Sequence, residues 1–186
     1  MQNRYAPSGI DTSDAEKLTE TMQERLYALI DLGLTLKHIH WNVVGPGFIS
    51  VHEMLDEQVA KVRVMADDVA ERISTLGGIA NGLPGGLTSG RSWDDYALGR
   101  GVVPAHLGAL DRMYEGVISG HREAVTMSGD IDPITEDLFI AQTRTLELFQ
   151  WFVRAHLENT SGELPTTDAE SQLDAAAAAA TADHLG

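Results

Sequence analysis

The sequence contains no cysteine among its 186 residues. This absence excludes disulfide bonds, thiolate metal sites and cysteine nucleophiles, so any bound metal must be held by histidine and carboxylate side chains. No run approaches the roughly 18 apolar residues that a membrane-spanning helix requires. Residues 1–11 also lack the basic-then-apolar pattern of a signal peptide. We therefore expect a cytoplasmic protein with no membrane partner, with nucleoid association as an alternative.

Basic residues are scarce, because 13 Lys and Arg stand against 28 Asp and Glu and leave a net charge of -15. This balance argues against a simple nucleic-acid binder, whose affinity depends on neutralising phosphate. The apolar share of 43% and the charged share of 22% are ordinary for a globular protein. The length suits one domain with a proper core.

Alternating strand patterns are also lacking, whereas four long stretches show the apolar spacing of helices. The predicted helices cover about 13–41, 51–76, 104–129 and 133–158. The clearest core stripe lies on the second helix and comprises Leu55, Val59, Val62, Ala66, Val69, Ile73 and Leu76. A Gly-rich loop is expected over 79–91, followed by a single helical turn at Ser92–Tyr96. Two pairs of long helices joined by such a link predict an all-α four-helix bundle with one crossover.

The predicted domain organisation has three parts. Residues 1–12 form an N-terminal arm, residues 13–159 the bundle domain, and residues 160–186 an acidic, Ala-rich flexible tail. The tail contains no Lys or Arg, because Arg154 is the last basic residue of the chain, and it includes an alanine run at 175–180.

Five imidazole and carboxylate side chains at helical spacing are candidates for a metal site. His40 ends the first helix, and the turn through Gly45 and Pro46 returns the chain so that His40 and His52 become neighbours. The second helix carries two pairs four residues apart, His52 with Asp56 and Asp67 with Glu71. Each pair alone is more often a solvated surface feature, and a single buried histidine is more often hydrogen-bonded to backbone.

The geometry of the second helix strengthens the metal hypothesis. At 100° per residue both pairs fall in one sector, roughly 115° from the apolar stripe. His52 and Asp67 are, however, about 22 Å apart along the axis, too far to share a metal within one chain. Two antiparallel copies of the helix, crossing near Lys61 and Val62, would bring His52 and Asp56 of one chain to Asp67 and Glu71 of the other.

Three sequence motifs resemble the Dps family of mini-ferritins within the ferritin-like superfamily: His40–Val43 (HWNV), Val51–Asp56 (VHEMLD) and Asp67–Arg72 (DDVAER). The resemblance implies a ferritin-like four-helix bundle in a hollow dodecamer built from twofold dimers. It also implies a ferroxidase that oxidises Fe(II), preferentially with hydrogen peroxide, and stores ferric mineral. Carried onto this chain, His40, His52 and Asp56 of one subunit and Asp67 and Glu71 of its mate are the expected catalytic metal ligands.

Other features of the sequence leave alternatives open. Family members often bind DNA through basic tails, which this chain lacks, so we expect DNA binding to be weak or absent. The competing functions are a DNA-protecting nucleoid protein with little catalysis and an iron-free helical scaffold. Asp130, Asp132, Glu136 and Asp137 either line a threefold pore or cap a helix. Trp41 and Trp151 either donate electrons to stray oxidants or simply pack, and packing is the commoner role.

Overall fold

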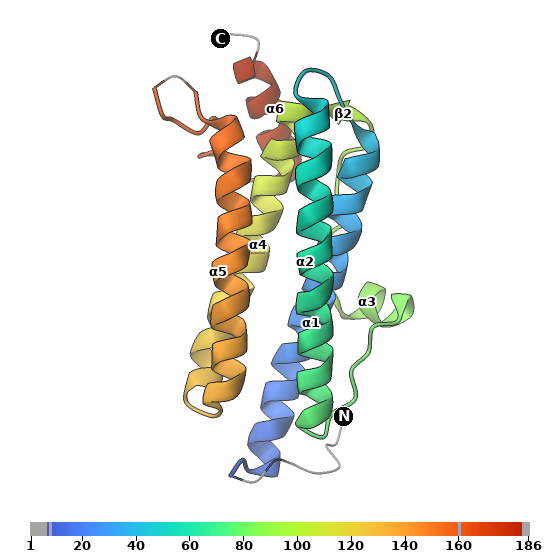
Figure 1. Ribbon diagram of the computed structural model, residues 1–186, viewed down its shortest axis with the longest axis vertical. Helices are drawn as coiled ribbons and strands as arrows, with labels where there is room; N and C mark the ends of the chain where they lie inside the picture. Colours follow the sequence, from blue (N-terminus) through green and yellow to red (C-terminus); the bar gives the residue numbers. More distant parts are fainter. Residues whose placement is uncertain (1–6, 8, 160, 184–186) are drawn as a thin grey trace. The chain divides into compact units, whose positions relative to one another are not determined.

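The computed structural model describes residues 7, 9–159 and 161–183, and this part of the chain contains six helices (Figure 1). Two pairs of long helices carry the fold, and the prediction of an all-α protein is confirmed. The long helices are α1 (Thr12–Asn42), α2 (Phe48–Thr75), α4 (Val103–Gly129) and α5 (Pro133–Leu157). The short helices are α3 (Pro84–Gly90) and α6 (Gln172–Asp183). The strands β1 (Val43–Val44) and β2 (Gly101–Val102) form a two-residue parallel ladder.

The ends of α2 follow from its flanking glycines. Gly45 and Gly47 both have positive φ, at 95° and 73°. Because glycine adopts this conformation without a Cβ penalty, the turn is complete at Gly47 and α2 begins at Phe48, three residues earlier than predicted. At the other end Gly77 has a φ of 82°, and the Gly78 N–H donates to the Ile73 carbonyl at 2.9 Å, which closes the helix as a Schellman cap.

The chain divides into two compact units, and each long helix contributes a segment to both. One unit comprises Met1–Gly33, Lys61–Ser92 and Val117–Arg144, and the other comprises Leu34–Ala60, Trp93–Gly116 and Thr145–Gly186. The predicted stripe on α2 is buried in both units, apart from the half-buried Ala66. Side-chain hydrogen bonds also cross between helices within a unit. Gln142 of α5 donates to the Met65 carbonyl of α2 in the first, and Tyr114 of α4 donates to Gln58 of α2 in the second.

The link between α2 and α4 differs from the prediction. The segment expected to be a loop contains α3, which starts at Pro84 and buries Leu87. Gly90 at its end lies against the ring of Tyr27, where a Cβ would come within 2.4 Å of Cε2. The helical turn predicted at Ser92–Tyr96 is wrong, because these residues are not helical. The glycine and proline content of 79–91 predicts a loop, but tertiary packing supports a short helix in this segment.

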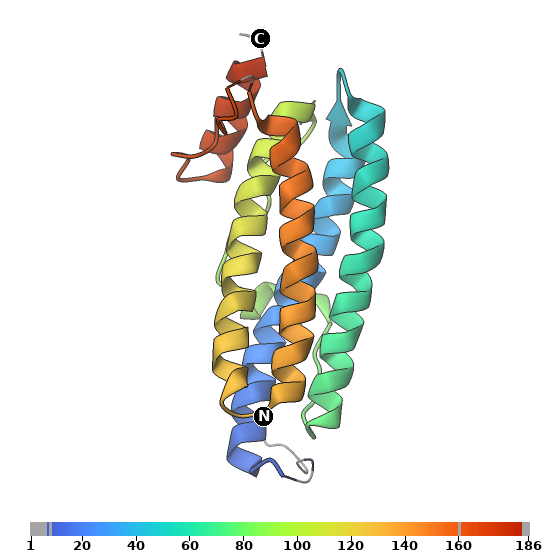
Figure 2. The same ribbon diagram turned by 60° about the vertical axis from the view of Figure 1, so that its left-hand side comes forward.

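The C-terminal segment also differs from the expected flexible tail. Helix α6 buries Ala175, Ala176 and Ala179 and lies beside the first part of α4 (Figure 2). A Cβ on Gly108 of α4 would come within 2.4 Å of the Ala175 carbonyl, so the two helices approach closely. An alanine run has no amphipathic periodicity, which is why the sequence did not reveal a docked helix. None of the helices in the described residues is long and apolar enough to cross a membrane.

Candidate metal centre

His40 and His52 form the centre of the candidate site. His40 lies in the last turn of α1 and His52 in the second turn of α2, and the Gly45–Gly47 turn joins the two helices. The rings stack with their centroids 3.5 Å apart and an interplanar angle of 21°. The predicted proximity of these two histidines is therefore confirmed.

Reciprocal hydrogen bonds set the chemistry of both rings. Nδ1 of His40 lies 2.9 Å from the His52 carbonyl, and Nδ1 of His52 lies 3.0 Å from the His40 carbonyl. Because a carbonyl only accepts, each Nδ1 must carry the hydrogen. The neutral rings therefore each keep a lone pair on Nε2, the form in which histidine binds a metal. The backbone contact expected of an ordinary core histidine is present, and it also prepares both rings as ligands.

Asp56 follows His52 by one turn of α2. Its Oδ1 lies 2.7 Å from Nζ of Lys37 and 3.4 Å from Nδ1 of His40. The hydrogen bond from Lys37 lowers the pKa of Asp56, so this exposed carboxylate is charged at neutral pH. The positive charge of Lys37 balances the Asp56 carboxylate, as a bound metal cation would otherwise do. Lys37 was not expected at this site from the sequence, although a cation three residues before His40 on the same helix was a visible signal.

Asp67 and Glu71 lie one turn apart on α2 and are both exposed. Neither carboxylate has a hydrogen-bond or ion-pair partner among the described residues. They belong to the unit that includes Lys61–Ser92, whereas His40, His52 and Asp56 belong to the other. Within the described part of this single chain, no group of three or more His, Asp and Glu side chains is arranged to hold a metal ion.

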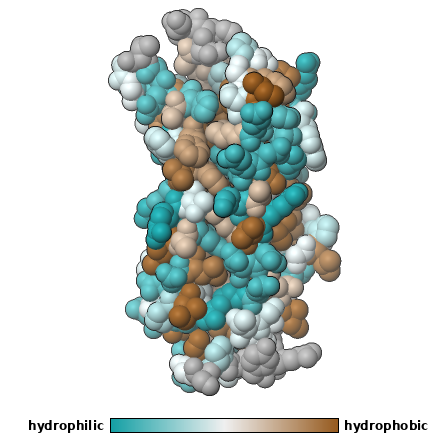
Figure 3. All heavy atoms as spheres, viewed as in Figure 1, coloured by the Kyte–Doolittle hydropathy of each residue, from teal (hydrophilic) through white to brown (hydrophobic). Residues whose placement is uncertain are grey.

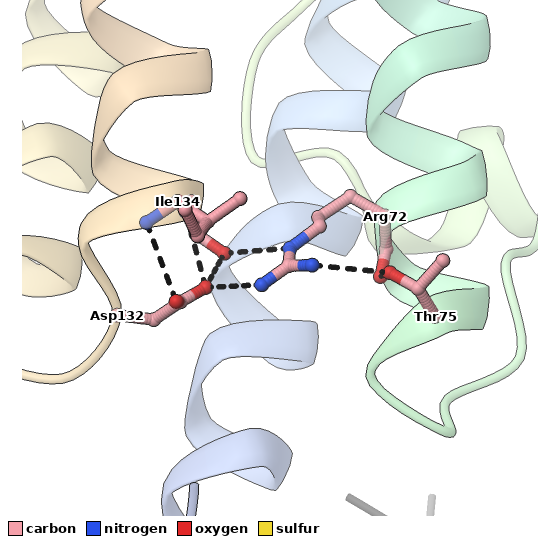
Figure 4. Close-up of polar contacts among 5 residues, drawn as sticks. Arg72, Thr75, Asp132 and Ile134 are labelled. Carbon is pink, nitrogen blue, oxygen red and sulfur yellow. Dashed lines mark hydrogen bonds and ion pairs between the residues drawn. The ribbon is translucent and has the colours of Figure 1, made fainter. Parts of the chain in front are cut away.

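Arg72, the neighbour of Glu71, ties the end of α2 to the start of α5 (Figure 4). Its Nη2 donates to Asp132 at 2.5 Å and its Nε donates to Thr135 Oγ1 at 3.1 Å. Asp132 also accepts the backbone N–H groups of Ile134 and Thr135, as an N-cap does. Burial raises the pKa of Asp132, but hydrogen bonds from Thr135 and Arg72 and the Arg72 charge together lower it.

Asp132 is only 4% exposed, so it serves the helix cap that was one of its two predicted roles. The pore-lining role predicted for Asp130, Asp132, Glu136 and Asp137 depends on other subunits and stays a prediction. Trp41 and Trp151 are exposed in the single chain, at 72% and 59%, and their rings contact Lys37 and Phe152 respectively, so both of their predicted roles stay predictions.

Comparison with known proteins identifies the family. Residues 19–162 match the Ferritin-like domain family. A "DNA protection during starvation protein" of Mycolicibacterium smegmatis is 51% identical over 156 residues, covering 84% of this chain and 85% of the relative. The solved structure of "DpsA14 from Streptomyces coelicolor" superposes with a TM-score of 0.87 at 59% identity, covering 88% of this chain and 98% of that one. The chain belongs to the Dps family.

A second similar protein has a name that refers to pili and not to DNA protection. The Haemophilus ducreyi protein named "Fine tangled pili major subunit" is 49% identical over 156 residues and covers 84% of this chain. Membership of the Dps family and the ferritin-like fold support iron storage or DNA protection in general terms.

Proposed function

We propose that the protein is a ferroxidase that oxidises Fe(II) and stores the ferric product. The observation that carries the proposal is the reciprocal hydrogen bonding of His40 and His52, which directs both ring hydrogens to backbone and leaves both Nε2 lone pairs for iron. Asp56, one turn from His52, adds an anionic oxygen ligand. Imidazole and carboxylate ligands together suit iron, and thiolates are absent from the chain.

The centre is completed by a second subunit. Asp67 and Glu71 have no partner among the described residues of their own chain, as expected of side chains that bind a metal at a subunit interface. Val64 lies between the two halves of the proposed site on α2 and is 58% exposed, as expected of an apolar residue that a neighbouring helix covers. On the face drawn in Figure 3, apolar atoms reach the surface between polar ones. We infer a twofold dimer as the building block of a dodecamer.

Each bound iron is a substrate, and the chain's residues determine how it reacts. Asp56, Asp67 and Glu71 stabilise the ferric product more than the ferrous substrate, because carboxylates bind the higher charge more strongly. Two Fe(II) ions each give one electron to one hydrogen peroxide, which takes up two protons and leaves as two waters. Lys37 must release Asp56 before iron binds there. The net charge of -15 favours accumulation of Fe(II) and ferric mineral over DNA binding.

Mixed shells provide the sharpest test of a shared centre. His52→Ala and Glu71→Ala each remove a ligand from every centre, so shells of either variant alone should lose most peroxide-dependent Fe(II) oxidation. In a dimer of one variant with the other, one of the two centres regains all its ligands. Random co-assembly should therefore restore about a quarter of the wild-type centres.

A matched control pair is His52→Ala co-assembled with Asp56→Ala, both on the same side of the centre, which should restore nothing. Equal failure of both mixtures would contradict a shared centre. Full activity of the single-variant shells would contradict the ligand assignment, and failure of the wild-type shells to take up Fe(II) would support the iron-free scaffold instead.

A further inference from the structure

Half-buried Tyr96 and buried His106 form a hydrogen-bonded pair outside the candidate metal centre. The Tyr96 hydroxyl lies 3.0 Å from Nδ1 of His106 and 3.3 Å from the His106 carbonyl. The rings are nearly parallel, with centroids 6.0 Å apart and an interplanar angle of 11°. Tyr96 lies in the segment between α3 and β2, and His106 lies in the first turn of α4 and is fully buried.

The surroundings of His106 decide which ring nitrogen holds the hydrogen. Nε2 faces the β1–β2 ladder, because a Cβ on Gly101 would lie 3.3 Å from it. The backbone carbonyls of Asn42 and Gly99 lie beside the ring and favour its protonated form. Nε2 itself has no hydrogen-bond partner among the described residues. Because the nearby carbonyls could only accept, we place the hydrogen of the neutral ring on Nε2. Nδ1 then has a lone pair and accepts the hydrogen bond that the Tyr96 hydroxyl donates.

Neither group is charged at neutral pH. Burial raises the pKa of the Tyr96 hydroxyl, which excludes a phenolate, and burial lowers the pKa of His106, which keeps the imidazole neutral. A phenol that cannot ionise beforehand loses an electron readily only if its proton leaves at the same time. His106 provides a base in hydrogen-bond contact for that proton.

We propose that Tyr96 and His106 form a redox-active pair, in which Tyr96 gives one electron to a one-electron oxidant while its hydroxyl proton passes to Nδ1 of His106. The products are a neutral tyrosyl radical and a His106 imidazolium, which the backbone carbonyls of Asn42 and Gly99 stabilise. Hydroxyl radical, formed when a single Fe(II) reacts with hydrogen peroxide, is the oxidant class concerned. It takes the electron and a solvent proton and becomes water. A further Fe(II) then reduces the tyrosyl radical, and His106 returns the proton.

A ring contact leads from the pair towards the candidate metal centre. His38 meets Tyr96 edge-on, with centroids 5.9 Å apart at 67°, and its Nε2 lies 2.8 Å from the Leu98 carbonyl. His38 is on α1, two residues before His40. The source of the oxidant rests on the proposed function, but the redox chemistry of the pair does not.

Tyr114 supplies an internal control. Its hydroxyl is fully buried and donates to Oε1 of Gln58 at 2.7 Å, so it too is a hydrogen-bonded tyrosine. An amide oxygen is not a base at neutral pH, and Tyr114 therefore has no group that can take its proton. Both tyrosines are hydrogen-bonded, whereas of the two only Tyr96 has a basic group that can take its proton.

The test uses the full-length, iron-free protein and a photogenerated one-electron oxidant, a ruthenium tris-bipyridine complex with persulfate, followed by freeze-quenched electron paramagnetic resonance. Wild type and Tyr114→Phe should give the same tyrosyl signal, and Tyr96→Phe should lose at least half of it. His106→Gln should slow formation of the signal several-fold and abolish its solvent deuterium isotope effect. Loss in Tyr114→Phe but not in Tyr96→Phe, or no effect of His106→Gln, would overturn the proposal.

Electron–nuclear double resonance on the unmodified protein keeps the proposal testable if His106→Gln fails to fold. The radical oxygen should show an exchangeable proton at hydrogen-bond distance, and its absence would also overturn the pair. A second arm adds limiting Fe(II) and then hydrogen peroxide. A Tyr96 radical in the photochemical arm but not in the iron arm would contradict the proposed iron chemistry while leaving the pair intact.

Discussion

His40 and His52 each use one ring nitrogen for folding and leave the other for chemistry. The carbonyl that each Nδ1 contacts belongs to the other histidine, so the two ligands orient each other. Removing either ring therefore removes one proposed ligand and the stacking partner of the other ring, but leaves the backbone carbonyl that holds the remaining Nδ1. Around them, single residues adjust charge, and two of these adjustments lead to predictions.

Replacement of Lys37 by Met should increase the affinity for Fe(II). Lys37 contacts Asp56 at 2.7 Å and competes with a metal for the same carboxylate oxygen. Methionine keeps the length of the side chain but removes the charge, so Asp56 no longer has a resident cation. We expect the dissociation constant for Fe(II), measured by anaerobic calorimetry on assembled protein, to fall about three-fold to ten-fold, the range of a modestly exposed ion pair. Lys17→Met, which removes an exposed ion pair with Asp14 on α1, is the control, and an equal change there would refute the explanation.

Buried His121 should make stability depend on pH. Burial is the main cause that lowers the pKa of His121 to about 4, with Arg25 as a further one. Below about pH 6.5 the unfolded chain therefore binds a proton that the folded chain does not bind. The free energy of unfolding decreases as the pH falls from there. The loss should be about 2 kcal/mol between pH 7 and pH 5.

Urea unfolding at several pH values in that range measures the effect. His121→Leu should flatten the pH dependence, whereas His156→Leu, at an exposed position on α5, should not. An unchanged slope in His121→Leu would show that another group is responsible.

At the scale of helices, close approach is set by small residues rather than by large apolar ones. Helix α6 lies on α4 where Gly108 meets Ala175 and Ala179, and polar contacts are made nearby at Asp111. Asp111 of α4 accepts from Arg154 and Gln150 of α5 and from Thr166, which precedes α6. The tail is thus held by a hydrogen-bond network and by alanine packing at once.

Gly108→Ala should release α6. The new Cβ would lie 2.4 Å from the Ala175 carbonyl, a backbone atom that cannot move without shifting the helix. We expect amide hydrogen exchange over 172–183 to become at least ten-fold faster, since the helix has few other buried side chains. Gly116→Ala on the same helix meets nothing within 4 Å and should leave this exchange unchanged. Equal protection in both variants would refute the packing argument.

At the scale of the whole molecule, charge separates the two general roles of the family. Excess negative charge attracts ferrous ions and repels DNA, and the C-terminal segment adds no Lys or Arg after Arg154. The assembled protein should therefore concentrate iron without binding nucleic acid.

Duplex DNA should not bind the assembled protein at about 150 mM salt in a gel-shift titration. Addition of millimolar magnesium tests divalent bridging, one of the routes by which an acidic protein can bind DNA. Tight binding without magnesium that weakens with salt would contradict this prediction and favour the DNA-protecting alternative.

Helical periodicity and ligand spacing were readable from the residues alone, because both depend only on the geometry of an α-helix. The stripe from Leu55 to Leu76 and the proximity of His40 and His52 were predicted in this way. Four other features were not predicted: the short helix α3, the docked helix α6, the Lys37–Asp56 ion pair and the Tyr96–His106 pair. Each of these features depends on contacts between residues that are not neighbours in the sequence. The free energy of such contacts exceeds the weak local preferences for secondary structure that a sequence shows.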